Sequence, residues 1–134
     1  MLTILLIDDD LFFPARVATR LEPHGVTVRV ADEGKLAQVL ADPPHCVVVN
    51  FGATPERRAL FVRQLKQDPR TRGIPVLAFA GHLETELHRR AREAGADKVV
   101  ANSALSERPL ALIEAVIERV RAGMAPDPNE IVEE

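Results

Sequence analysis

Five short apolar runs, each followed by a segment with helical periodicity, are the feature that most constrains the fold of this chain. Apart from the second run, they are rich in Val, Ile and Leu without polar alternation, which is typical of strands covered on both faces. Strands that alternate regularly with helices favour a parallel sheet between two helical layers. The sequence therefore predicts an α/β fold: a doubly wound five-stranded parallel sheet flanked by five helices.

The boundaries follow from periodicity and from Pro, Gly and Asp residues. The predicted strands cover residues 4–7, 26–30, 46–50, 74–80 and 99–100. The first helix follows Asp10, with Pro14 in its first turn, and four more are predicted over 33–41, 56–67, 83–94 and 107–122. The side chains expected to face inward include Leu11, Ala15, Ala18 and Leu21 in the first helix, Leu60, Phe61 and Leu65 in the third, and Leu83, Leu87, Ala91 and Ala94 in the fourth. Residues 1–122 are predicted to form one domain and residues 123–134 a flexible acidic C-terminal tail.

Composition and charge argue against several function classes. Residues 1–122 carry 17 basic and 16 acidic side chains, a net charge of +1, and the tail adds four acidic residues. Neither value indicates a nucleic-acid or membrane partner. No run reaches transmembrane length, and the single cysteine, Cys46, excludes an internal disulfide and is expected to be a small buried residue. A cytoplasmic location is expected.

The carboxyl ends of the predicted strands define the candidate site, because ligands of open parallel sheets bind there. These ends carry Asp8 to Asp10, Asn50, Ala80-Gly81 and Ala101 to Ser103.

Three motifs in the same order give the chain a family resemblance. They are Ile4-Leu5-Leu6-Ile7-Asp8-Asp9-Asp10, then Leu65-Lys66-Gln67-Asp68-Pro69 through Ile74-Pro75-Val76-Leu77, then Ala94-Gly95-Ala96-Asp97. Over roughly residues 2–122 the chain resembles the receiver domain of two-component response regulators. The resemblance implies a flavodoxin-like fold and a role in two-component signal transduction or a phosphorelay.

The resemblance also implies a pocket, and this chain departs from it. In that family an acidic pair binds Mg²⁺, a neighbouring Asp accepts a phosphoryl group, and a Thr or Ser, a Lys and an aromatic residue complete the switch. The corresponding positions here are, in that order, Asp8 and Asp9, Asn50, Ala80, Asn102 and Val99. Only the acidic pair matches, so the chain is interpreted as a degenerate receiver, or pseudo-receiver.

The residue types at these positions support that interpretation. The amide of Asn50 cannot form an acyl phosphate, because the nucleophile must be a carboxylate oxygen. Ala80 lacks the hydroxyl, and Asn102 lacks the cation that would stabilise a transferring phosphoryl group. Val99 has no ring to move. The pocket is expected to carry a formal charge of −2 with no cation, and the protein is not expected to be an enzyme.

Several residues allow two interpretations. Asp8 and Asp9 form either a weak or vestigial Mg²⁺ site or, with Asp10, a set of caps for helix N–H groups. Asn50 is a fixed mimic of one signalling state, or a structural amide that donates to Asp8 or Asp9. A basic stretch over the third helix is expected to be a solvated face, and the four histidines are scattered, with only His82 beside the pocket. The basic residues of that stretch are Arg57, Arg58, Arg63, Lys66, Arg70 and Arg72.

The favoured function is a phosphorylation-independent signalling module that binds a protein partner. The partner is expected on the face made by the fourth helix, the fifth strand and the last helix, drawing on residues 83–94, 98–101 and 105–121. A homodimer through the same face is a further option. The alternatives are a phosphoacceptor that uses Asp8 or Asp9 and a small-ligand sensor in the vacated pocket. No cofactor is expected beyond weak Mg²⁺ binding.

Overall fold

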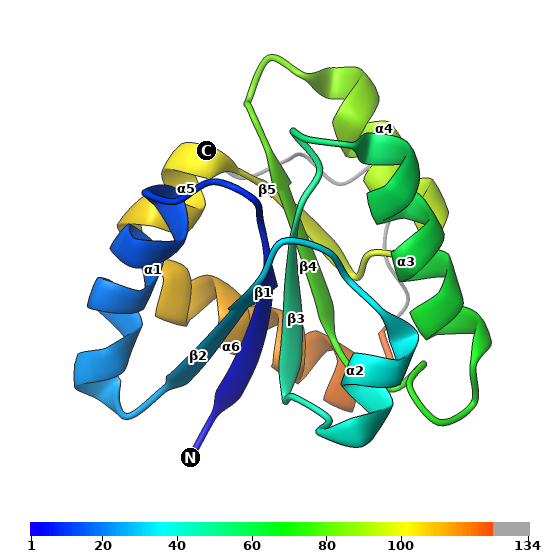
Figure 1. Ribbon diagram of the computed structural model, residues 1–134, viewed down its shortest axis with the longest axis horizontal. Helices are drawn as coiled ribbons and strands as arrows, with labels where there is room; N and C mark the ends of the chain where they lie inside the picture. The colour runs from blue at the N-terminus through cyan, green and yellow to red at the C-terminus, as the bar shows by residue number, and fades with distance from the viewer. Residues whose placement is uncertain (125–134) are drawn as a thin grey trace.

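A single all-parallel sheet forms the centre of the computed structural model, which describes residues 1–124 (Figure 1). Its five strands lie in the order β2-β1-β3-β4-β5. They are β1 Thr3–Ile7, β2 Thr27–Ala31, β3 Cys46–Asn50, β4 Val76–Ala80 and β5 Lys98–Ala101. The predicted five-stranded parallel sheet is confirmed, and all five strands therefore end at one edge.

Helices cover both faces of the sheet. Helices α1, α5 and α6 pack on one face and α2, α3 and α4 on the other (Figure 1). Their bounds are α1 Phe13–Leu21, α2 Leu36–Ala41, α3 Pro55–Gln67, α4 Thr85–Ala94, α5 Asn102–Glu107 and α6 Pro109–Arg121, with a 3₁₀ turn, η1, over Glu22–His24. The part of the chain that the structure describes thus holds six α-helices, one more than predicted.

The additional helix comes from the segment after β5. The sequence predicts one helix over 107–122, but α5 begins at Asn102 and a break at Arg108 separates it from α6. Pro109 stands at the start of α6, where its fixed φ favours helix initiation and its missing N–H costs nothing. Because α5 begins at Asn102, this residue lies in the first turn of a helix rather than in a loop.

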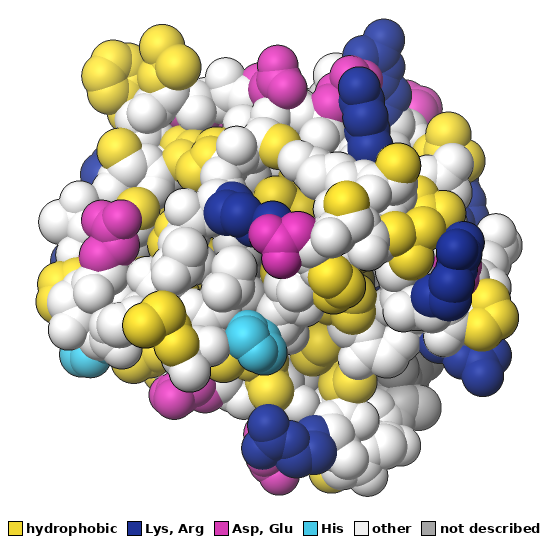
Figure 2. Space-filling view, turned by 60° about the horizontal axis from the view of Figure 1, so that its bottom comes forward, with side chains coloured by type: hydrophobic (Ala, Val, Ile, Leu, Met, Phe, Trp, Pro, Cys, Tyr) yellow, Lys and Arg dark blue, Asp and Glu magenta, His cyan; other side chains and the backbone are white. Residues whose placement is uncertain are grey.

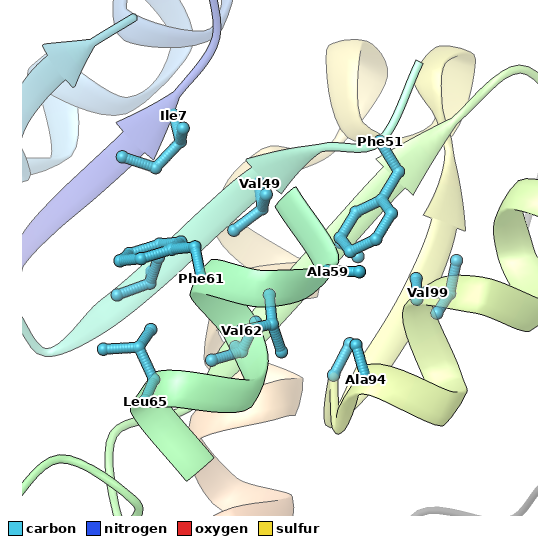
Figure 3. Close-up of a cluster of buried hydrophobic side chains, with 14 of the residues drawn as sticks. Ile7, Val49, Phe51, Ala59, Phe61, Val62, Leu65, Ala94 and Val99 are labelled. Atoms are coloured by element: carbon cyan, nitrogen blue, oxygen red, sulfur yellow. The ribbon is translucent and has the colours of Figure 1, made fainter. Parts of the chain in front are cut away.

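Alternate residues of each strand supply the two cores. In β1, Leu5 and Ile7 belong to the core beneath α2, α3 and α4, and Ile4 and Leu6 belong to the core beneath α1, α5 and α6. Figure 3 shows the first core, where side chains of α3 lie over the sheet. Coverage of both faces explains why the central strands are apolar throughout.

The inward face of α1 differs from the predicted one. Leu11 is 82% exposed and Ala15 is also exposed, whereas Phe13, Val17 and Leu21 are buried. The helix begins only at Phe13, so the i, i+4, i+8 stripe starts there and not at Leu11. Phe13 stacks on a sheet residue, Phe79, with ring centroids 5.1 Å apart.

In each of two further helical segments a polar residue is buried, and a leucine that was predicted to face inward is exposed. In α3, Leu60 is exposed and Arg58 is buried, and in α4, Leu83 precedes the helix and His88 is buried. Helix α4 ends where predicted, at Gly95, whose φ of 115° is accessible to glycine at little cost.

A partly buried ion pair ties α3 to the loop before β5. Lys66 Nζ lies 2.7 Å from Asp97 Oδ2, which also accepts a hydrogen bond of 2.8 Å from the Val76 N–H at the start of β4. Lys66 is therefore an internal residue and not part of a solvated face.

The predicted tail over 123–134 lies outside the described residues, apart from its first two positions. Within residues 1–124, no helix has both the length and the apolar character needed to cross a bilayer.

Candidate functional site

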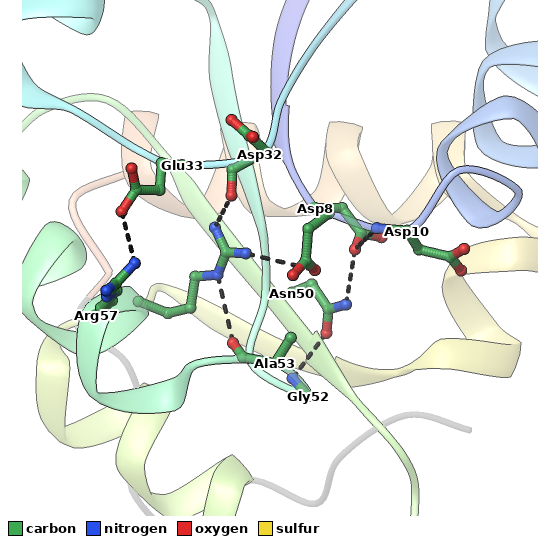
Figure 4. A network of polar contacts seen from close by, with 10 residues as sticks. Asp8, Asp10, Asp32, Glu33, Asn50, Gly52, Ala53 and Arg57 are labelled. Carbon is green, nitrogen blue, oxygen red and sulfur yellow. Dashed lines mark hydrogen bonds and ion pairs between the residues drawn. The ribbon is translucent and has the colours of Figure 1, made fainter.

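The carboxyl end of β1 places a buried carboxylate at the centre of the candidate site. Asp8 is 2% exposed, and its Oδ1 accepts hydrogen bonds from Asn50 Nδ2 at 2.9 Å and from the Asp10 N–H at 3.0 Å (Figure 4). Its Oδ2 is also buried and has no hydrogen-bond partner among the described residues. Asp8 is thus held by donors on one oxygen only.

Asn50, the last residue of β3, is the structural amide that one sequence interpretation predicted. Its Nδ2 donates to Asp8, and its Oδ1 accepts a hydrogen bond of 2.7 Å from the Gly52 N–H. A backbone N–H can only donate and an ionised carboxylate can only accept, so these neighbours fix which way the amide points. Asn50 therefore presents a nitrogen where a phosphoacceptor would present an oxygen.

Arg58 is the site residue that the sequence analysis missed. It is 3% exposed and lies in the first turn of α3, on the buried side of the helix. Its Nη1 donates to the Asp32 carbonyl at 3.1 Å, its Nε to the Ala53 carbonyl at 3.4 Å, and its Nη2 lies 3.7 Å from Asp9 Oδ1. The expectation of a pocket without a cation is therefore wrong.

A signal for Arg58 was present in the periodicity of α3. The buried positions of this helix are Arg58, Ala59, Phe61, Val62 and Leu65. Arg58 lies three residues before Phe61 and four before Val62, so it shares their inward face of the helix. The sequence analysis had grouped Arg58 with the basic stretch that includes Arg57. Arg57 is exposed and pairs with Glu33 at 3.0 Å.

The three successive aspartates do not cap the first helix, which corrects that part of the prediction. Asp8 accepts from the Asp10 N–H, and Asp10 accepts from the Phe12 N–H at 3.1 Å, so both bonds lie in the loop before α1. The N-cap position of α1 is Phe12, and no side chain bonds to the helix there. The carboxylates shape the β1–α1 loop and leave Asp9 half exposed beside Arg58.

The remaining predicted positions lie around this centre. Ala80 ends β4, is fully buried and pairs in register with Ala101 of β5. Asn102 is exposed at the start of α5. Val99 is buried in the core shown in Figure 3, close to Ala94 and Phe51. Strand ends thus bring Asp8, Asn50, Ala80 and Asn102 to one edge of the sheet, whereas Val99 lies within β5.

The residues present do not fit a magnesium ion. Mg²⁺ requires near-octahedral oxygen ligands. Among the candidate donors, buried Asp8 Oδ2 is one oxygen without a hydrogen-bond partner in the described part of the chain. Asn50 turns its nitrogen toward Asp8 and its oxygen toward the Gly52 N–H. Asp9 lies beside the Arg58 guanidinium, so the other positions do not complete an oxygen ligand set. Within residues 1–124 there is no group of three or more His, Cys, Asp or Glu side chains placed to hold a metal.

Charge on the face of the molecule that Figure 2 shows is dispersed. On the face that Figure 2 shows, basic and acidic side chains lie among one another and form no continuous basic patch. On α4, Arg89 pairs with Glu86 and Glu93, three and four residues away along the helix, and hydrogen bonding to Arg89 holds the pKa of Glu86 below its ordinary value. Such exposed pairs contribute little to stability.

Cys46 is fully buried in β3, as predicted. Burial raises the pKa of its thiol far above the ordinary value, so the thiolate is not accessible at neutral pH.

Comparison with solved structures relates the fold of this chain to known structures. A putative response regulator from Chloroflexus aurantiacus J-10-fl matches with a TM-score of 0.80 and 21% identity, over 88% of this chain and 98% of that one. The chemotaxis response regulator CheY4 of Vibrio cholerae matches with a TM-score of 0.75 and 19% identity, over 87% and 98%. NtrX from Brucella abortus has a TM-score of 0.78 and 21% identity, over 91% of this chain but 28% of NtrX.

The fold is receiver-like. At these identities the likeness concerns the fold, and no protein-family model or curated protein matches the sequence. In this receiver-like frame, the site at the carboxyl edge contains an amide, two carboxylates and a buried guanidinium.

Proposed function

We propose that this protein is a signalling module that works without phosphorylation and binds a protein partner. One observation carries the proposal: at the end of β3, Asn50 donates its amide N–H to Asp8 and accepts from the Gly52 N–H. Both ends of the side chain are engaged in structural bonds, and neither is a nucleophile. The receiver-like fold supplies the signalling context.

The environment of Asn50 supports the same proposal. Ala80 and Val99 are buried hydrocarbon side chains, so they offer no hydroxyl and no polar-tipped ring to relay a change at the pocket. The exposed side chain of Asn102 is uncharged. Without a hydroxyl at Ala80, a ring at Val99 or a charge at Asn102, these positions favour a constitutive state.

Intact-mass measurement tests the absence of phosphorylation. The protein is incubated with acetyl phosphate and Mg²⁺ and then weighed, with a receiver of known phosphoacceptor activity treated in parallel. We expect no mass gain in this protein and a gain of one phosphoryl group in the parallel sample. A stoichiometric gain that hydroxylamine removes would refute the proposal.

A second candidate function is phosphorylation at Asp9, and one observation favours it. The Asp9 side chain is 50% exposed, and Arg58 Nη2 lies 3.7 Å away, so a cation is present beside an accessible carboxylate. Two of the three guanidinium nitrogens already donate to backbone carbonyls, however. The same mass measurement separates the two functions, because peptide mapping of any labile phosphoryl group would assign it to Asp9.

We propose that the partner docks on the face of α4, β5 and α6. Strand β5 is an edge strand of the sheet, and α4 packs on one face of the sheet and α6 on the other (Figure 1). Arg89→Glu, on the exposed side of α4, is expected to abolish partner capture from the native cell, whereas Arg63→Glu on α3 leaves it intact. Equal capture by both variants would contradict this docking face. Capture that acetyl phosphate changes would contradict binding without phosphorylation.

A further inference from the structure

Arg58 joins three loops at the carboxyl edge of the sheet. Its guanidinium contacts Asp9 after β1, the carbonyl of Asp32 after β2 and the carbonyl of Ala53 after β3. One positive charge thus holds together the ends of three neighbouring strands.

Because the Arg58 guanidinium is buried, its stability in the folded protein depends on these contacts. A guanidinium that is 3% exposed has lost most of its water, and such a group is stable only when its donors meet acceptors and a negative charge. Nη1 and Nε donate to the two carbonyls, and Asp9 supplies the negative charge beside Nη2. With Asp8, Asp9 and Arg58 ionised, the site carries a formal charge of −1.

The loop that supplies one of these carbonyls adopts a strained conformation. Thr54, between Ala53 and α3, has a φ of 43°, and it is the one non-glycine residue with positive φ in residues 1–124. For a β-branched residue this region is unfavourable by about 1 kcal/mol or more. The strain is localised where the chain turns from the Ala53 carbonyl into the helix that carries Arg58.

From this geometry we propose that Arg58 is a resident cation, which occupies the role of a divalent metal at the acidic edge and excludes it. The guanidinium offsets the charge of Asp9 and, through the Asp32 and Ala53 carbonyls, links the loops after β1, β2 and β3. The site is therefore closed in the absence of metal. This inference concerns the pocket alone and stands whether or not a partner binds at the α4 face.

The proposal is tested by Mg²⁺ titration of three proteins, followed by ¹⁵N chemical shifts of the Asp8, Asp9 and Gly52 amides. The parent protein is expected to show no saturable shift below about 10 mM Mg²⁺, since its carboxylates face a cation. Arg58→Met removes the charge and keeps an apolar side chain of similar length, and we expect its Mg²⁺ affinity to rise at least tenfold. Arg57→Met is the matched control: it removes the neighbouring, exposed arginine and is expected to behave as the parent.

Three results with the parent, Arg58→Met and Arg57→Met would overturn the proposal. They are submillimolar Mg²⁺ binding by the parent, no gain in affinity in Arg58→Met, or an equal gain in Arg57→Met. If Arg58→Met does not fold without metal, folding rescued by millimolar Mg²⁺ but not by equal ionic strength of NaCl supports the proposal, and absence of rescue contradicts it. Arg58→Lys keeps a cation and is expected to remain insensitive to Mg²⁺, so a Mg²⁺ affinity like that of Arg58→Met would also contradict it.

Discussion

Replacement of Asn50 by Asp tests whether the network around Asp8 depends on an amide. The Asn50 Nδ2 donor lies 2.9 Å from Asp8 Oδ1, so Asn50→Asp places a second carboxylate oxygen against an acceptor that is buried. The favourable bond becomes a repulsive contact. The Gly52 N–H keeps its acceptor, because either side chain offers an oxygen there.

The size of the effect can be bounded from this geometry. A hydrogen bond to a charged group contributes about 1.5–3 kcal/mol. Two like charges at 2.9 Å repel by about 6 kcal/mol at an effective dielectric constant of about 20. The penalty is limited, however, because the new carboxyl can bind a proton, which costs about 4 kcal/mol at pH 7 for a group with an ordinary pKa near 4. We therefore expect Asn50→Asp to lower the free energy of unfolding by about 2–4 kcal/mol at pH 7.

The sign of the pH dependence distinguishes repulsion from simple loss of packing. The folded state raises the pKa of the new carboxyl, so it holds a proton more tightly than the unfolded chain does. The variant's stability relative to the parent then falls as pH rises above about 4, by up to about 1.4 kcal/mol per pH unit, and levels off above the raised pKa. At about pH 4 the protonated carboxyl donates to Asp8 as the amide did, and the deficit nearly disappears.

Urea denaturation at pH 7 and pH 4 in metal-free buffer measures this difference. Circular dichroism is the suitable probe, because the chain has no Trp or Tyr. The matched control is Asn102→Asp, which makes the same chemical change at an exposed position and is expected to stay within about 0.5 kcal/mol of the parent. An Asn50→Asp variant as stable as the parent at pH 7, or a deficit that does not shrink toward pH 4, would refute the reasoning.

Three further predictions concern other parts of the molecule. Asn50→Asp is not expected to restore a switch, and acetyl phosphate should change its partner affinity less than tenfold, as measured by calorimetry; a larger change would show that the pocket still relays. Lys66→Met leaves the Asp97 carboxylate without its cation and is expected to cost about 3 kcal/mol in urea denaturation, whereas Arg63→Met, exposed on the same helix, should cost less than about 0.5 kcal/mol. Cys46 should react with a thiol reagent only in urea, because burial raises the pKa of its thiol and blocks access; rapid modification of the native protein would contradict this.

Local sequence patterns predicted much of the architecture. Runs such as Cys46–Asn50 are apolar over a strand's length, and the predicted bounds of β3 match the observed ones. A parallel sheet aligns the carboxyl ends of its strands, so the proximity of Asp8 and Asn50 followed from topology. The hydrogen bond between these two side chains was one of the interpretations that the sequence allowed.

Patterns near chain turns were less informative. The starting residue of α1 decides which side chains face inward, and a two-residue shift exposed Leu11 and buried Phe13. The break at Arg108 also depends on how α5 and α6 pack, which periodicity over 107–122 does not encode. In each case a small local change alters the direction of many side chains.

Periodicity places Arg58 on the inward face of α3, but the partners of its guanidinium were decided by tertiary structure. In the sequence it belongs to a basic stretch, and a charged helical residue next to Arg57 is expected in solvent. In the fold, its donors meet carbonyls after β2 and β3 and its charge meets Asp9 after β1. Whether the cost of removing an arginine from water is compensated depends on acceptors from distant segments, and the sequence alone does not specify where those acceptors lie.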